Sequence, residues 1–240
     1  MRRVSLVFLL LCALGFGAWR WRHIDRGHWE NLGNDLEMRR YQVLSGAGQI
    51  SIIAFRVPAS HVHLVARDLL FAESWRVKAK ARVAVNGGYF DAAYKAIGLR
   101  VARGRVLSPP ASSAWPVFWI RQGVAHIGQV ADWSAGGRAS DAVQCGPRLV
   151  RAGQVQPVKA QWARRTGIGV EADGRVVVAI AQGPLLFSDW AGEWASADGL
   201  DCRDAMNLDG GGSTQMSVDA AGRRVTLDGL WPVPDSIVIR

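Results

Sequence analysis

The sequence predicts a single α+β domain, with mixed or antiparallel β-sheet and a few packed helices. The chain has 240 residues, of which 49% are hydrophobic, and this suits one globular core rather than a disordered chain. Most apolar segments are short, rich in Val and Ile, and separated by glycine turns. Asp173-Gly174, between two apolar runs, is a strong signal for a β-hairpin.

The strands and helices can be placed from the apolar pattern. We expect strands or strand pairs in residues 49–57, 61–67, 81–91, 98–110, 115–128, 145–155, 165–181 and 231–240. One helix is expected in 71–80, and another begins near Asp189, with Ser188 as its N-cap, and ends before Gly199. The second arm of the 165–181 hairpin is almost entirely Val, Ile and Ala, so we expect it to be buried on both faces.

Residues 1–22 are expected to form a signal peptide or an N-terminal membrane anchor. Two arginines precede an apolar run over residues 4–19, and this order is typical of export signals. As a helix the run spans about 24 Å, short of the ~30 Å hydrocarbon core of a membrane. A buried helix is the alternative, and the terminal arginine pair argues against it. Cleavage of the segment stays open.

The expected domain organisation follows from that segment. A connector over 23–40 leads to the main domain over 41–240. The protein is expected to be exported, and either periplasmic or anchored in the inner membrane and facing outward. If the N-terminal segment is not cleaved, it binds the membrane.

The chain is basic, with a formal net charge of +9. Residues after the N-terminal segment remain basic, which favours phosphorylated or acidic glycans, lipid head groups or nucleic acid as partners. Simple solubility is an equally good explanation. The arginines are scattered and the chain is expected to be exported, so we expect no nucleic-acid partner.

The cysteine and histidine content indicates no zinc site. Outside the N-terminal segment the cysteines are Cys145 and Cys202, and both a disulfide and two separate thiols remain open. His61 and His63 share one face of a predicted strand without a third ligand nearby, so we expect them to be structural. The sequence requires no cofactor. A divalent cation is conceivable for loops rich in Asp, but no calcium-loop spacing supports it.

Two glycine-rich segments carry the residues best suited to chemistry. "VAVNGGYFD" and "AMNLDGGGST" each combine a small apolar run, an Asn, consecutive glycines and an Asp. Glycines let a ligand approach the backbone, and successive amides can bind an anion. An adjacent Asp can serve as acid, base, nucleophile or metal ligand. The alternative is a pair of tight turns stabilised by their Asp side chains, but two such loops in one chain favour a shared site.

Common catalytic motifs do not fit the second loop. The nucleophile elbow G-x-S-x-G lacks its last glycine, because Gln215 stands there. The phosphate-binding P-loop would need Gly-Lys before the hydroxyl residue, and the dinucleotide fingerprint fails at the same glutamine. Ser213 could still be a nucleophile, but no motif supplies its base.

Taken together, these segments resemble a known family. "AVNGGYFD", "GPRLV", "RRTGIG" followed by "DGR", "NLDGGGST" and the closing "PVPDSIVIR" are similar, in this order, to the phosphodiester glycosidases. The resemblance covers residues 40–240. It implies a mixed α/β fold and a hydrolase that cleaves the sugar from a sugar-1-phosphodiester, leaving the phosphate on the acceptor.

The resemblance also suggests roles for individual residues. Glycoside hydrolysis generally uses two carboxyl groups across the scissile bond, and Asp91 and Asp209 are the expected catalytic pair. Arg165 is the first choice for the phosphate, because its planar fork binds two oxygens. The further residues expected to bind substrate are Asn86, Gly87, Gly88, Thr166, Gly210, Gly211, Gly212 and Ser213.

Each role has a plainer alternative. Arg165 could be a solvated charge at a strand end. Asn86 and Asn207 could stabilise turns. Arg148 is a weaker phosphate ligand, and Glu171 is expected to be a solvated strand residue. Trp231 is the tryptophan we would test for stacking on a sugar ring.

Two functions from other classes compete with hydrolysis. A non-catalytic envelope domain would bind glycans or sugar phosphates without releasing sugar. An envelope interaction protein would act through its N-terminal segment, and Asp209 would then be dispensable.

Overall fold

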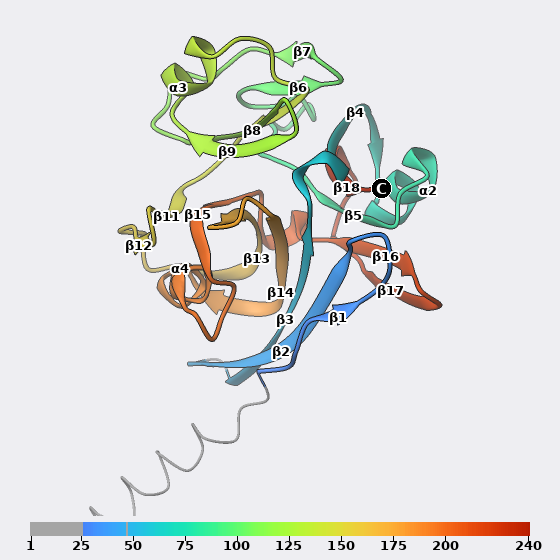
Figure 1. The fold of residues 1–240 in the computed structure, drawn as a ribbon, viewed down its shortest axis with the longest axis vertical. Coiled ribbons are helices and arrows are strands. Elements are labelled where there is room, and N and C mark those ends of the chain that lie inside the picture. The colour runs from blue at the N-terminus through green and yellow to red at the C-terminus, as the bar shows by residue number, and fades with distance from the viewer. Residues whose placement is uncertain (1–25, 47) are drawn as a thin grey trace, which may run out of the picture.

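The computed structural model describes residues 26–46 and 48–240 (Figure 1). These residues form three β-sheets with helices packed beside them, and every strand pairing is antiparallel. The segment predicted as a signal peptide or anchor lies outside the described residues. Within the described ranges, no helix is long and apolar enough to cross a membrane.

The largest sheet has eight strands in the order β1-β2-β3-β14-β13-β15-β11-β12. Its strands are β1 (Glu30–Asn31), β2 (Glu37–Ser45), β3 (Gly48–Val57), β11 (Arg148–Arg151), β12 (Gln154–Val155), β13 (Trp162–Glu171), β14 (Val176–Leu186) and β15 (Cys202–Asn207). Strand β14 lies between β3 and β13, which explains why residues 176–181 are buried on both faces, as their apolar composition predicts. The sheet begins within residues 23–40, which the sequence analysis assigned to the connector.

Two five-stranded sheets complete the molecule. The second sheet, in the order β17-β16-β5-β18-β4, contains β4 (Val62–Leu70), β5 (Val83–Asn86), β16 (Met216–Ala220), β17 (Arg223–Leu227) and β18 (Val233–Ile239). The third sheet, in the order β7-β6-β10-β8-β9, contains β6 (Arg100–Ala102), β7 (Arg105–Ser108), β8 (Val117–Arg121), β9 (Val124–Gly128) and β10 (Asp141–Gln144).

The main core lies where the three sheets meet. It joins residues such as Phe55 of β3, Val85 of β5 and Phe118 of β8. Helix α4 (Phe187–Ala195) packs Trp190 and Trp194 against the other face of the eight-stranded sheet. Helix α2 (Ala72–Ala79) packs Trp75 against the second sheet.

The predicted fold class is confirmed, and so are most of the predicted elements. The exception is the start of α4, where Ser188 is not the N-cap. Leu186 occupies that position without a side-chain cap, because β14 runs directly into the helix and buries Phe187 in its first turn. The sequence analysis also missed the short helix α3 (Val130–Ala135), strand β10 and the β16–β17 hairpin.

The two cysteines are separate buried thiols rather than a disulfide. Cys145 belongs to the main core, whereas Cys202 packs under α4. Burial raises the pKa of the Cys145 thiol to about 12, so it stays protonated at neutral pH. Both cysteines act as small core residues.

Candidate active site at the glycine loops

The two glycine loops lie against each other. The first follows β5, in the second sheet, and the other follows β15, in the eight-stranded sheet. The Asp209 amide donates to the Gly87 carbonyl over 3.1 Å, and the Asn86 side-chain amide donates to the Asp209 carbonyl over 2.7 Å. The structure therefore brings together the two segments that the sequence singled out.

Asn86 and Thr166 hold this junction together. The Asn86 side-chain oxygen accepts from the Thr166 hydroxyl at 2.8 Å and from the Gln215 amide at 3.2 Å. Both side chains are buried, and the Thr166 carbonyl accepts from the Leu208 amide. Because their polar atoms are used inside the protein, these residues position the loops, which corresponds to the plainer alternative for Asn86.

Asp209 is the carboxyl group that this junction presents. It is partly exposed, and its Oδ1 accepts from the Gly210 amide at 2.8 Å. Burial raises the pKa of Asp209, while the Ser213 hydroxyl and the Gly210 amide act in the opposite direction. A carboxyl group with a raised pKa beside a loop is suited to proton transfer.

Trp231 covers the second glycine loop. Its indole N–H donates to the Ser213 hydroxyl oxygen at 3.0 Å, and a Cβ on Gly212 would lie 2.4 Å from the Trp231 ring. Gly211 has a φ of +59° and open space around it, so its glycine is required by backbone conformation. The amides of Gly211 and Gly212 begin a short 3₁₀ turn, where amides have no partner within the turn.

The first glycine loop has a different environment. The Gly87 amide donates to the Asp235 carbonyl at 3.0 Å, and the Gly88 amide donates to Asp235 Oδ1 at 2.9 Å. Asp235 in turn pairs with Arg100 at 2.8 Å, and both side chains are only 1% exposed. These two amides are therefore occupied inside the protein and do not present the free N–H groups that we expected for phosphate.

Sequence analysis missed the Arg100–Asp235 pair. The available signal was weak: Asp235 is the one acidic residue in the predicted strand 231–240, and Arg100 is one of three arginines in 98–110. A Cβ on Gly88 would lie 2.4 Å from the Arg100 guanidinium, and one on Gly87 would lie 1.8 Å from Asp235 Oδ1. Close packing on a buried ion pair thus requires both glycines.

Asp91 does not join this cluster. It is exposed, and its Oδ1 accepts from the amides of Ala93 at 2.8 Å and Lys95 at 2.9 Å. Asp91 therefore stabilises an exposed turn in this structure, and its pairing with Asp209 across a scissile bond stays a prediction.

Arg165 is a buried cation without a carboxylate partner among the described residues. It is 3% exposed, donates to the carbonyls of Leu185 and Gln161, and lies 3.8 Å from the centre of the Phe187 ring. Burial lowers the pKa of Arg165 to about 10, and the nearby Tyr89 acts in the opposite direction. Arg165 is therefore not the solvated charge of the plainer alternative.

Tyr89 and Asn207 connect Arg165 to the loops. Burial raises the pKa of Tyr89. The charge of Asp209 also raises it, whereas a hydrogen bond with Asn207 and the charge of Arg165 lower it. Its hydroxyl donates to the Gly146 carbonyl at 2.5 Å. Asn207 Oδ1 is buried without a hydrogen-bond partner in the described structure. Tyr89 was missed from the sequence, although it directly follows the glycine pair.

The remaining candidates lie in other environments. Arg148 pairs with Asp204, and Glu171 pairs with Arg56 and Arg175. His63 lies 3.6 Å from Asp141. The described part of the chain contains no group of three His, Cys, Asp or Glu residues that could hold a metal ion.

Comparisons with known proteins agree with the fold. The catalytic domain of zebrafish N-acetylglucosamine-1-phosphodiester α-N-acetylglucosaminidase, auto-inhibited by its pro-peptide, has a TM-score of 0.72 at 16% identity. That match covers 88% of this chain and 85% of the zebrafish chain. No curated protein matches the sequence.

Two bacterial structures are also similar. A hypothetical protein from Synechocystis has a TM-score of 0.64 at 13% identity, covering 89% of this chain and 64% of its own. A Burkholderia pseudomallei protein has a TM-score of 0.61 at 14% identity, covering 82% and 75%. The model of the phosphodiester glycosidase family matches residues 79–240, which include both glycine loops and the closing strand. The chain therefore belongs to the phosphodiester glycosidase family.

Proposed function

We propose that this protein is an exported hydrolase that cleaves the sugar from a sugar-1-phosphodiester. The observation that carries the proposal is that Asp209, a carboxyl group of raised pKa, and Arg165, a buried cation without a carboxylate partner among the described residues, both act on the same side chain, Tyr89. The charges of the two groups shift the pKa of Tyr89 in opposite directions: Asp209 raises it and Arg165 lowers it. A buried cation is costly unless it is paired, so a phosphate arriving at Arg165 would be strongly favoured.

The reaction needs only a few groups from the protein. A water oxygen attacks the anomeric carbon, the bond from that carbon to the phosphate oxygen breaks, and the phosphate monoester leaves with the electron pair. Asp209 accepts the proton of the attacking water. Because phosphate is already a good leaving group, one carboxyl group is sufficient, which agrees with the position of Asp91 outside the cluster.

The substrate contacts are assigned from the polar atoms of the second loop. Arg165 binds the phosphate together with the amides of Gly211 and Gly212, whereas the Gly210 amide and the Ser213 hydroxyl, which already contact Asp209 and Trp231, would have to exchange those contacts to bind substrate. Asn207 Oδ1, which is unpartnered and buried, accepts from a sugar hydroxyl or from the attacking water. The exposed part of Trp231, which is 40% accessible, offers a surface for stacking on the sugar ring.

The test is a screen of sugar-1-phosphodiesters for release of free sugar, with and without a chelator. Release by the wild-type protein, and its loss in Asp209→Asn, is expected. Binding of the same compounds without release would favour a non-catalytic binding domain instead. A chelator-sensitive reaction would show that a divalent cation takes part.

Export is the second part of the proposal. It rests on the arginine pair and the apolar run within residues 1–22. Fractionation of cells that produce the full chain, followed by detection with an antibody, should place the protein outside the cytoplasm. Deletion of residues 1–22 should retain it in the cytoplasm.

A further inference from the structure

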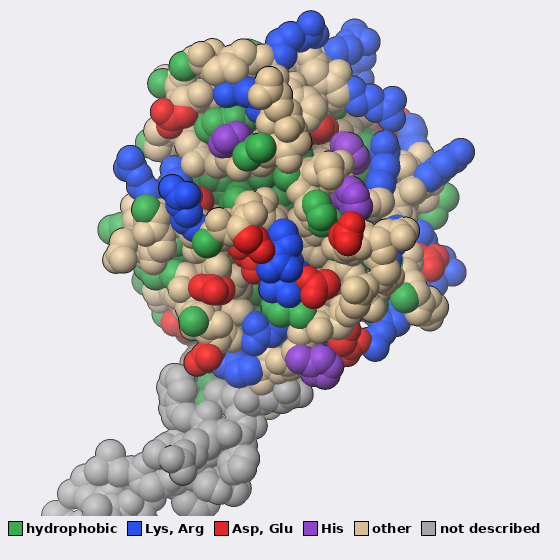
Figure 2. All heavy atoms as spheres, viewed as in Figure 1, with side chains coloured by type: hydrophobic (Ala, Val, Ile, Leu, Met, Phe, Trp, Pro, Cys, Tyr) green, Lys and Arg blue, Asp and Glu red, His purple; other side chains and the backbone are tan. Residues whose placement is uncertain are grey.

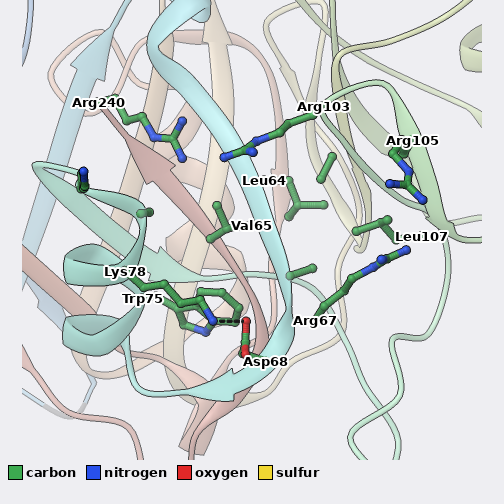
Figure 3. Close-up of a pocket in the computed structure, with 14 residues that line it drawn as sticks. Leu64, Val65, Arg67, Asp68, Trp75, Lys78, Arg103, Arg105, Leu107 and Arg240 are labelled. Carbon is green, nitrogen blue, oxygen red and sulfur yellow. Dashed lines mark hydrogen bonds and ion pairs between the residues drawn. The ribbon is translucent and has the colours of Figure 1, made fainter.

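A groove outside the glycine-loop site lies between β4, the end of α2 and the β6–β7 hairpin (Figure 3). Its volume is about 720 Å³. Its lining includes Arg67 of β4, Arg105 of β7 and the final residue, Arg240. None of the residues assigned above to the Asp209 site lines it, so it is a separate feature of the molecule.

The side chains of the arginines in this groove lack partners, unlike those of most arginines in the described ranges. Most of these form ion pairs, as Arg56 and Arg148 do, or donate to oxygens of the protein, as Arg39 and Arg121 do. Within the same ranges, the arginine side chains that make no ion pair and donate no hydrogen bond are Arg67, Arg103, Arg105, Arg151 and Arg240. All of these except Arg151 line the groove.

The unpaired guanidinium groups point toward one another in two pairs. In Figure 3, Arg103 and Arg240 point toward each other above Leu64 and Val65. Arg67 and Arg105 point toward each other near Leu107 in the same view. Two guanidinium groups repel each other unless an anion lies between them. Each pair therefore marks a position for one anionic group.

The backbone of β4 supports this orientation of Arg67. Pairing between β4 and β18 shifts in register between Val233 and Asp235, and Arg67 has a φ of +82°. A bulge in a strand redirects a side chain, and unfavourable backbone conformations of non-glycine residues occur most often at functional sites. The fold thus holds Arg67 toward the groove despite its backbone preference.

The rest of the lining is mostly apolar, with two lysines, Lys78 and Lys80, and little negative charge. Asp68 is the acidic residue of the lining, and it is already paired with Lys78 at 2.7 Å. Leu64 lies between the two arginine pairs in Figure 3. A ligand that fits this pattern has an organic body and anionic groups on both sides.

We propose that this groove binds an organic ligand with two phosphate-type groups. One group is held by Arg103 and Arg240, and the other by Arg67 and Arg105, since guanidinium forks bind phosphate oxygens well. The hollow shape favours a soluble molecule over a flat bilayer surface. The proposal does not depend on the proposed hydrolase activity, because Asp209 takes no part in the groove.

The test is calorimetric titration of the protein with three probes at low salt: glucose 1,6-bisphosphate, glucose 6-phosphate and glucose. We expect the bisphosphate to bind most tightly, the monophosphate more weakly, and glucose not at all. Arg105→Glu and Arg240→Glu should each weaken bisphosphate binding by about tenfold or more. Arg151→Glu is the matched control, because it makes the same charge change at the unpaired arginine outside the groove, and it should leave binding unchanged.

Several outcomes would overturn the proposal. Equal weakening by Arg151→Glu would mean that binding depends only on net charge. Equal affinity for glucose 1,6-bisphosphate and glucose 6-phosphate would show that the groove binds only one phosphate group. Binding to phosphatidylglycerol vesicles without binding to the soluble bisphosphate would point to a membrane instead. Loss of binding in Asp209→Asn would assign the ligand to the glycine loops, whereas retained binding supports a separate site.

Discussion

The two glycine loops look alike in sequence but require glycine for different reasons. At Gly87 and Gly88, the amides donate to Asp235, and added side-chain atoms would collide with the Arg100–Asp235 pair. At Gly211 the backbone has a positive φ, and at Gly212 the Trp231 ring occupies the space. The first loop therefore packs against buried residues, whereas the second presents amides and Asp209 toward the surface.

This difference assigns separate roles to the two loops. The first loop supports the junction, because its polar groups are used inside the protein. The second is the loop that we propose for chemistry, because Asp209 keeps a partly exposed carboxyl group of raised pKa. Two similar motifs can thus divide support and chemistry between them. Figure 2 shows Lys and Arg side chains in several separate groups on this face, mainly along its top and right edges, so positive charge alone does not mark the site.

The largest expected effect separates the two aspartates. Asp209→Asn should lower kcat by about 10²–10⁴-fold, the usual loss when a general acid or base is removed. Asp91→Asn should keep kcat near the wild-type value, because Asp91 stabilises an exposed turn. Kinetics on a sugar-1-phosphodiester measure both, with circular dichroism as the control for folding.

A loss of activity in Asp91→Asn would support the original expectation that Asp91 and Asp209 form a catalytic carboxyl pair. If Asp91→Asn loses as much activity as Asp209→Asn while remaining folded, the turn must open to bring Asp91 to the substrate.

The pH profile of the wild-type protein gives a second check on the role of Asp209. If Asp209 is the base, kcat/KM should rise with pH through a pKa above the ordinary Asp value, because burial disfavours the charged form.

The next effect concerns the support of the first loop. Asp235→Asn should lower the free energy of unfolding by about 3–5 kcal/mol, because it leaves Arg100 charged and unpaired in the core. Urea denaturation measures this loss. Asp68→Asn is the matched control on an exposed pair with Lys78, and should cost less than about 1 kcal/mol. Equal costs for the two variants would contradict the supporting role.

A smaller effect is expected at Arg165, the cation that we propose for phosphate binding. Arg165→Met should lower kcat/KM by about 10–100-fold, since a hydrogen bond to a charged group contributes about 1.5–3 kcal/mol. Arg165→Lys, which keeps the charge but loses the fork, should retain part of that activity. Steady-state kinetics with varied substrate give the values. Unchanged kcat/KM in Arg165→Met would exclude this arginine from phosphate binding.

The smallest effect compares single glycines. Gly211→Ala should cost about 1 kcal/mol of stability, because alanine tolerates a positive φ poorly but meets no neighbouring atom. Gly88→Ala should cost more, because its new methyl group collides with the Arg100 guanidinium. Thermal unfolding ranks the two variants. If Gly211→Ala lowers the unfolding temperature more than Gly88→Ala does, backbone conformation at Gly211 matters more than the collision with Arg100 at Gly88, contrary to the comparison of the two loops.

Much of the fold was predictable because it depends on local patterns. The apolar runs located most strands, and Asp173-Gly174 located the central hairpin. Ser188 was misplaced as a cap because the start of α4 depends on burial of Phe187, which is a tertiary contact. The site was predictable in part: the two loops were found, but the electrostatic influence of Asp209 and Arg165 on Tyr89 was not, since these residues are distant in the chain.

The sequence by itself determined the α+β class, the family-like motifs and the presence of two loops rich in Asn, Gly and Asp. These properties follow from composition, periodicity and residue order, which act over short stretches. Only the tertiary structure decided that Asp91 stabilises an exposed turn, that Arg165 is buried without a carboxylate, and that Arg100 and Asp235 form an ion pair under Gly88. Burial and charge partners depend on which strands the three sheets bring together, and no local stretch of sequence contains that information.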